Sequence, residues 1–109
     1  MADTAKTLGQ SNPAAVTLID LYTVPAATSA VIGSIIICNQ AAASATFRIS
    51  VAVAGASDTA KQYIYYDETV PGNKTFIATI GITLATTDVL RIYASTANIS
   101  FNLSGVEIT

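Results

Sequence analysis

Alternation of large apolar side chains with polar or small ones over residues 46–53 is the sequence feature that limits the fold most. The apolar positions are Phe47, Ile49, Val51 and Val53. A period of two places these side chains on one side of an extended chain, which is the pattern of a β-strand with one buried face. No segment of the chain shows the 3.6-residue period of an amphipathic helix. The chain is therefore predicted to be all-β.

Six further apolar segments, each bounded by turn residues, predict six more strands at residues 17–24, 30–39, 61–67, 75–84, 89–95 and 98–107. Short strands at this spacing are typical of a sandwich or a barrel. A chain of 109 residues has room for one hydrophobic core. We expect a single antiparallel β-sandwich of about seven strands, Ig-like or jelly-roll-like, over residues 14–109.

The dipeptide Pro71-Gly72 marks one chain reversal. Proline fixes φ for the first central position of a turn, and glycine tolerates the positive φ that a type II turn needs next. This pattern predicts a hairpin between the strands at residues 61–67 and 75–84.

Residues 1–13 are polar and aperiodic, and they end in Asn12-Pro13. They are predicted to form an extended N-terminal arm outside the sheets. Terminal segments fray unless something holds them. Because the arm offers little apolar surface to its own domain, we infer that a neighbouring chain holds it.

The segment at residues 31–38 is apolar at almost every position. Alternation places Val31, Ile35 and Ile37 on one face and Ile32, Ile36 and Cys38 on the other. A strand that is apolar on both sides is normally covered on both. Either a subunit interface covers the second face, or a loop or the N-terminal arm does so within the monomer.

A run of tyrosines at residues 63–66 raises a similar question, because alternation places Tyr63 and Tyr65 on one face and Ile64 and Tyr66 on the other. Tyrosine presents a rigid apolar ring with a polar tip, which suits protein interfaces and the stacking of sugars. Three interpretations remain open: a protein interface, ordinary cross-strand packing, or a carbohydrate site.

Catalytic and metal-binding patterns are missing from the sequence. The chain has no histidine, so Ser-His and Cys-His pairs and histidine-ligated metals are excluded, and the single Cys38 is expected to be a small buried apolar residue. The turn carboxylates Asp67 and Glu68 lack the spacing of a calcium loop. We expect no catalytic residue, no metal, no cofactor and no small-molecule ligand.

Charge and hydropathy also limit the partners. Only 11% of residues are charged and the net charge is −2, so there is no basic surface for nucleic acid. The longest apolar stretch, residues 31–38, is far shorter than a membrane span, and the residues after Met1 lack the apolar stretch of an export signal. A surface with so little charge suits close packing against other proteins.

Much of the chain resembles small structural proteins of tailed bacteriophages, and the resemblance lies in residues 20–25, 30–39, 47–53 and 61–67. It implies a non-enzymatic capsid decoration or cement protein that is made in the bacterial cytoplasm and binds the outside of the capsid. The implied partners are the major capsid protein and copies of the chain itself, as a homotrimer. The candidate contact residues are Lys6, Leu8, Gln10 and Asn12 in the arm, together with Tyr63 and Tyr65.

Two alternatives differ in class. A tail or head-fibre module would bind a host-surface glycan through residues 63–66 or another virion protein. An enzyme would have to use unpaired turn carboxylates such as Asp67 for acid–base chemistry.

Overall fold

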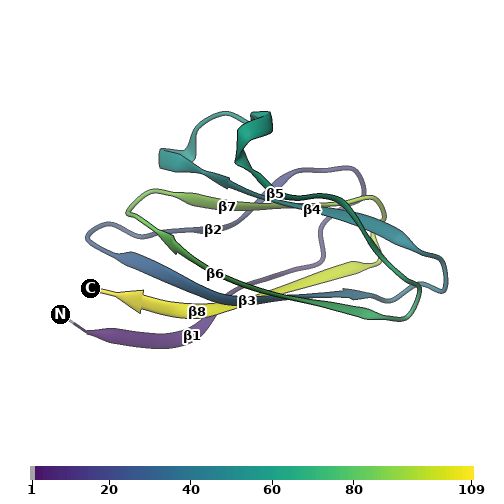
Figure 1. Ribbon diagram of the computed structural model, residues 1–109, viewed down its shortest axis with the longest axis horizontal. Helices are drawn as coiled ribbons and strands as arrows, with labels where there is room; N and C mark the ends of the chain where they lie inside the picture. Colours follow the sequence, from purple (N-terminus) through teal and green to yellow (C-terminus); the bar gives the residue numbers. More distant parts are fainter. Residues whose placement is uncertain (1) are drawn as a thin grey trace.

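The computed structural model describes residues 2–109, which form eight β-strands and two short 3-10 helices (Figure 1). The strands are β1 (Asp3–Ser11), β2 (Ile19–Thr23), β3 (Ser29–Asn39), β4 (Ala45–Ala52), β5 (Tyr63–Val70), β6 (Thr75–Leu84), β7 (Val89–Ala94) and β8 (Ile99–Ile108). The helices η1 (Val53–Gly55) and η2 (Ala60–Gln62) both lie between β4 and β5. All seven predicted strands are present, and the all-β prediction is confirmed. The described chain contains no helix long and apolar enough to cross a membrane.

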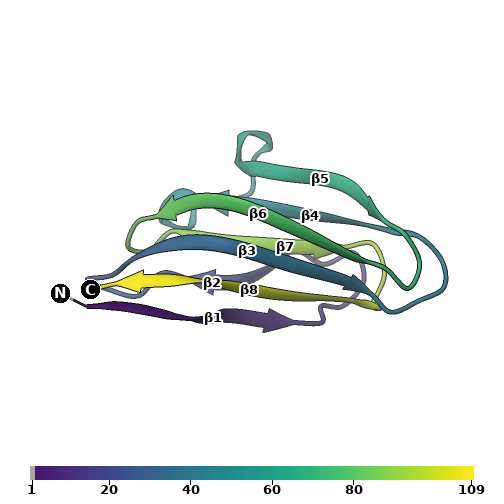
Figure 2. The same cartoon turned by 60° about the horizontal axis from the view of Figure 1, so that its bottom comes forward.

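Two four-stranded antiparallel sheets form the predicted sandwich (Figure 2). The first sheet has the order β1-β8-β3-β6, and the second sheet has the order β2-β7-β4-β5. The first strand pairs with the last, the second with the seventh, the third with the sixth and the fourth with the fifth. The chain therefore follows one long antiparallel ribbon that is rolled into two layers. This is the arrangement of an eight-stranded jelly roll, and it decides between the two sandwich types that the sequence left open.

The hydrophobic core fills the space between the sheets. Phe47 of β4 lies at its centre, with its ring centroid 5.2 Å from that of Phe76 on β6 and 6.3 Å from that of Phe101 on β8. Phe47 and Phe101 are fully buried. Burial of one such side chain contributes about 1.5–3 kcal/mol to folding, so these contacts across the layers are a main source of stability.

The N-terminal segment is part of the first sheet, and the prediction of a separate arm at residues 1–13 is wrong; Met1 lies outside the described residues. β1 pairs with β8 from Asp3 opposite Ile108 to Ser11 opposite Phe101. Figure 2 shows the two chain ends side by side at one end of these strands. Backbone hydrogen bonds hold an edge strand whatever its side chains are, so a polar segment can belong to a sheet.

The connection between β5 and β6 crosses from one sheet to the other, so the predicted hairpin is also wrong. β5 pairs with β4 and β6 pairs with β3. The reversal itself is present: the Lys74 N–H donates to the Pro71 carbonyl oxygen over 3.2 Å, and Asn73 rather than Gly72 has the positive φ, at 57°. Turn residues predict where a chain reverses but not which strands then pair.

A bulge in β3 changes the faces of its side chains. The register with both neighbouring strands shifts between Ile32 and Ser34: Gly33 is the extra residue relative to β8, whereas relative to β6 the extra residue lies in β6. Ile32 points inward before the bulge and Ile35 points inward after it, because an extra residue reverses the alternation. The prediction that Val31 shares a face with Ile35 is therefore wrong. Ile36, on the outer face, is 39% exposed, so neither a loop nor the N-terminal segment covers that face.

Candidate contact surfaces

The candidate residues Lys6 and Leu8 both make contacts within their own domain. The Lys6 ammonium lies 2.8 Å from Glu107 Oε1, and the Tyr22 hydroxyl donates a hydrogen bond of 2.6 Å to Glu107 Oε2. Tyr22 lies on β2 in the second sheet, so this cluster joins the two layers. The pKa of Glu107 is lowered, first by the hydrogen bond with Lys6 and then by that with Tyr22. Leu8 is half-buried against the core.

Gln10 and Asn12 are also held by the domain. Gln10 donates a side-chain hydrogen bond of 2.6 Å to Asn102 of β8. The Asn12 amide donates to the carbonyl oxygens of Ala97 and Ile99, over 2.9 and 2.8 Å. The inference that a neighbouring chain must order this segment is thus unnecessary, because the domain itself provides its partners.

Tyr63 and Tyr65 lie on opposite faces of β5, contrary to the predicted alternation. The register of β5 with β4 shifts twice, because β5 contains extra residues on either side of Tyr65. Tyr65 packs into the core, with ring centroids 5.8 Å from Phe47 and 5.6 Å from Phe76. Tyr63 instead lies beside Tyr66 on the outer side of the second sheet, and their rings meet edge to face at 5.0 Å.

Arg48 is the centre of a cluster that the sequence analysis did not single out. Its guanidinium lies 4.1 Å from the ring centroid of Tyr66 and 4.3 Å from that of Tyr93. It also donates hydrogen bonds of 2.7 and 3.3 Å to the two carboxylate oxygens of Asp67. These bonds to Asp67 raise the pKa of Arg48. The outward position of Arg48, between Phe47 and Ile49, was the signal that could have revealed it.

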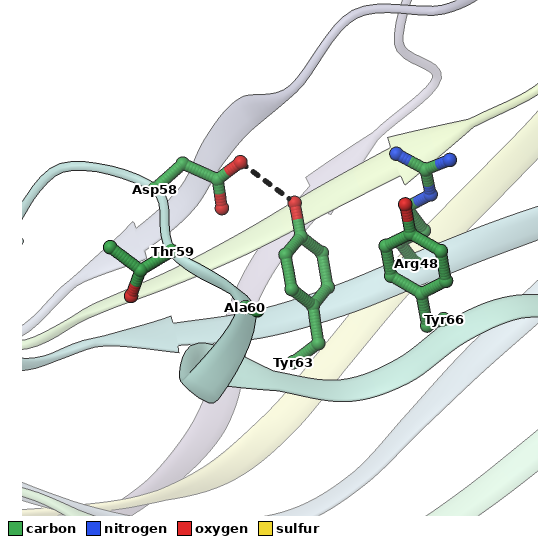
Figure 3. A pocket seen from close by; sticks show the side chains of 6 residues that line it. All are labelled: Arg48, Asp58, Thr59, Ala60, Tyr63 and Tyr66. Atoms are coloured by element: carbon green, nitrogen blue, oxygen red, sulfur yellow. Dashed lines mark hydrogen bonds between the residues drawn. The ribbon is translucent and has the colours of Figure 1, made fainter.

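A shallow depression of about 610 Å³ lies beside this cluster (Figure 3). Its walls are Arg48, Asp58, Thr59, Ala60, Tyr63 and Tyr66. The Tyr63 hydroxyl donates a hydrogen bond of 3.0 Å to Asp58. Burial raises the pKa of Tyr63, and the hydrogen bond to Asp58 raises it further. The connection between β4 and β5 thus brings Asp58 and Thr59 over the outer face of the second sheet.

The outer face of the first sheet is different, because none of the outward side chains of β3, β6 and β8 is charged. We call this surface the neutral face. Ile36 of β3 lies directly opposite Ile77 of β6, which is 65% exposed. Small hydroxyl and amide side chains surround this apolar pair. The neutral face consists of Ser29, Val31, Ser34, Ile36, Cys38, Thr75, Ile77, Thr79, Thr83, Ser100, Asn102, Ser104, Val106 and Ile108.

Cys38 and the acidic turn residues show no arrangement for chemistry. Cys38 is half-buried on the neutral face, whereas the sequence predicted a buried residue. Asp67 is paired with Arg48. Residues 2–109 contain no group of three or more Cys, Asp or Glu side chains placed to hold a metal ion.

No protein-family model and no curated protein matches the sequence. Among solved structures, the fold is similar to that of a chain in the structure of infectious bursal disease virus, Gx strain, with a TM-score of 0.53 and 12% identity. That match covers 97% of this chain but 31% of the other, so this chain spans about a third of the length of the viral chain. At this identity the likeness concerns the fold alone.

A second match is a pentameric capsid protein isolated from metagenomic phage sequences. It covers 93% of this chain and 59% of that chain at 16% identity, but its TM-score is 0.35. We draw no argument from a likeness of that size.

Proposed function

We propose that this protein is a structural component of a bacteriophage virion, a decoration or cement protein that binds the outer capsid shell and stabilises it. The observation that carries this proposal is the neutral face, where Ile36 and Ile77 lie side by side and exposed. Fully buried interface cores are depleted in charged residues, since desolvation of a charge is costly. A sheet face without charge can be buried against a protein without that cost.

The size of the neutral face suits a contact that several copies share. Its three strands, of about ten residues each with a rise of about 3.3 Å and a spacing of about 4.8 Å, cover roughly 475 Å². A standard protein interface buries about 800 Å² on each partner. One copy bound through this face alone would therefore bury only about 60% of the standard area. Contacts with further copies of the chain would supply the remainder, which agrees with the homotrimer that the phage resemblance implies.

The jelly roll agrees with this proposal but does not carry it. Eight-stranded jelly rolls occur in viral capsids and in lectins, so the fold is compatible with several functions. The similarity to a chain from a virus structure supports a place in a virion in the same limited way. In our proposal the major capsid protein is the partner, the capsid exterior is the location, and the protein is made in the bacterial cytoplasm.

The first test is the copy number of the chain in purified virions, measured by quantitative mass spectrometry against the major capsid protein. A decoration protein occupies repeated shell positions, so we expect hundreds of copies in each particle. A few copies would point to a tail or fibre component and would contradict the proposal.

The second test is Ile77→Lys, with Ile64→Lys as the matched control. Both isoleucines are exposed on strands, at 65% and 40%, but Ile64 lies on β5 in the second sheet. A buried lysine in the contact would be desolvated without a partner, so Ile77→Lys should lose occupancy on particles that lack the wild-type protein. Ile64→Lys should bind normally. Equal occupancy of both folded variants on the particles would show that the neutral face is not the contact surface.

A further inference from the structure

The depression on the outer side of the second sheet has walls suited to one class of ligand. Tyr63 and Tyr66 present two phenol rings at right angles, with an interplanar angle of 88°. Tyr66 is 60% exposed. Figure 3 shows both rings rising beside each other from β5, with the Asp58 carboxylate directed at the Tyr63 hydroxyl. Aromatic surface next to hydrogen-bonding groups suits a ligand that is apolar on one side and polar on the other.

The charges around the depression oppose ionic ligands of either sign. Both hydrogen bonds from Arg48 go to Asp67, so its charge is already balanced. Asp58 adds a second carboxylate, which repels phosphate and carboxylate groups. A cation at the Tyr66 ring would meet the guanidinium of Arg48, which already lies over that ring at 4.1 Å. A neutral ligand avoids both conflicts.

Hydrogen-bonding capacity remains for a ligand rich in hydroxyl groups. Asp58 Oδ2 accepts a hydrogen bond from the Tyr63 hydroxyl, which leaves Asp58 Oδ1 free to accept a hydrogen bond from a ligand. Thr59 lines the same wall, with its side chain directed away from the two rings. We propose that this depression binds a neutral saccharide, with the C–H face of a sugar ring on the side of the Tyr66 ring that Arg48 does not cover, the Tyr63 ring beside it and a ring hydroxyl at Asp58.

The wall that carries Asp58 and Thr59 is held in place before any ligand binds. Gln62 of η2 is 8% exposed, and its amide donates to the Ser57 carbonyl oxygen over 2.9 Å. Its side-chain oxygen accepts the Thr59 N–H, and the Gln62 N–H donates back to the Thr59 carbonyl oxygen over 3.2 Å. Such a wall need not be ordered on binding, which lowers the entropic cost. The volume of about 610 Å³ falls in the range of about 300–1,000 Å³ for ligand sites.

This site goes beyond the proposed shell function and does not depend on it. The depression lies on the second sheet, and the neutral face lies on the first sheet, on the other side of the sandwich. A copy that is bound through the neutral face would leave the depression open to solvent.

The experiment is an NMR titration of the ¹⁵N-labelled protein with lactose, maltotriose, mannotriose and chitotriose, and with sialyllactose as the acidic probe. We expect at least one neutral sugar to shift the amide signals of Asp58, Thr59, Tyr63 and Tyr66. Loss of one aromatic contact in Tyr66→Ala should weaken that binding roughly five- to tenfold. Asp58→Asn should weaken it as well.

Tyr93→Ala is the matched control, because Tyr93 also contacts Arg48 but does not line the depression. It should bind the sugar like the wild type. The proposal is overturned if no neutral sugar at tens of millimolar shifts these signals. Tighter binding of sialyllactose than of lactose would overturn the neutral class. Equal losses in Tyr66→Ala and Tyr93→Ala would show that the rings act only through Arg48, which also contradicts direct contact.

Discussion

Asn39, at the end of β3, holds together the loop after β3 and the crossing between the sheets. Its side chain is 1% exposed. Its amide nitrogen donates to the carbonyl oxygens of Ala43 over 2.8 Å and of Val70 over 3.1 Å, and its oxygen accepts the Ala41 N–H over 3.0 Å. The Pro71 carbonyl oxygen lies farther away, at 3.4 Å. Asn39→Ala removes all of these bonds and leaves backbone groups without partners where water has little access.

The size of the effect follows from these bonds. Each of the three short hydrogen bonds contributes about 1 kcal/mol, and an unsatisfied buried group adds to the cost, so Asn39→Ala should lower the free energy of unfolding by at least about 3 kcal/mol. Domains of this size have a total stability of roughly 5–15 kcal/mol. The melting temperature should therefore fall by roughly 12–20 °C.

Thermal and urea unfolding followed by circular dichroism measure this loss directly. Asn102→Ala is the matched control, because Asn102 is also an asparagine on a strand but accepts one side-chain bond on an exposed surface. It should cost about 1 kcal/mol or less. If Asn39→Ala unfolds at the same temperature as Asn102→Ala, the hydrogen-bond argument for Asn39 is refuted.

Three further variants test other parts of the fold. A Cβ on Gly72 would overlap the carbonyl oxygen of Ala42, so Gly72→Ala should lower the melting temperature more than Gly81→Ala, where φ is 45° but no atom lies within 4 Å. The Gly81 variant should cost about 1–2 kcal/mol from its positive φ alone, and a larger loss there than at Gly72 would contradict the steric argument. Because the pKa of Glu107 is lowered in the folded state, its stabilisation is present above the unfolded value near 4.5 and is lost as the pH falls through the folded pKa. The stability difference between wild type and Glu107→Gln should therefore shrink in urea unfolding below pH 4.5, and a difference independent of pH would contradict the role of Lys6.

The strands were predictable because this chain has few polar side chains in its core. Phe47 and Ile49 alternate with outward residues over the whole of β4, and the predicted range 75–84 coincides with β6. Ser, Thr and Ala fill the outward positions of several strands, so the period of two stands out against a background of small residues. β1 lacked this signal because Leu8 is its one large apolar side chain, and an edge strand held by its backbone needs no alternation.

The faces of the strands were less predictable than the strands themselves. A bulge adds one residue and reverses every side chain that follows it. Gly33 was a visible signal in β3, since glycine inside a strand often marks a bulge. Nothing comparable marks β5, where the extra residues fall among large side chains and Asp67 adopts a positive φ of 54°. The placement of Tyr63 and Tyr65 on opposite faces of β5 therefore follows only from the observed pairing of β5 with β4.

The same pairing explains why the two outer faces of the sandwich differ in charge. Each charged residue of β2, β4 and β7 lies opposite or next to its partner across strands, as Arg91 does with Asp20 over 2.9 Å, so the second sheet carries its ion pairs on its outer side. In the first sheet, the ion pair of Lys6 with Glu107 joins β1 to β8 near the chain ends, and the Tyr22 hydroxyl links Glu107 to the other layer. The central strands of that sheet therefore have no charged side chain that points outward. An uncharged outer face with paired isoleucines is poorly hydrated and loses little when it is buried, whereas a face of paired ions stays hydrated. This contrast is why we propose protein contact through the first sheet and ligand binding at the second.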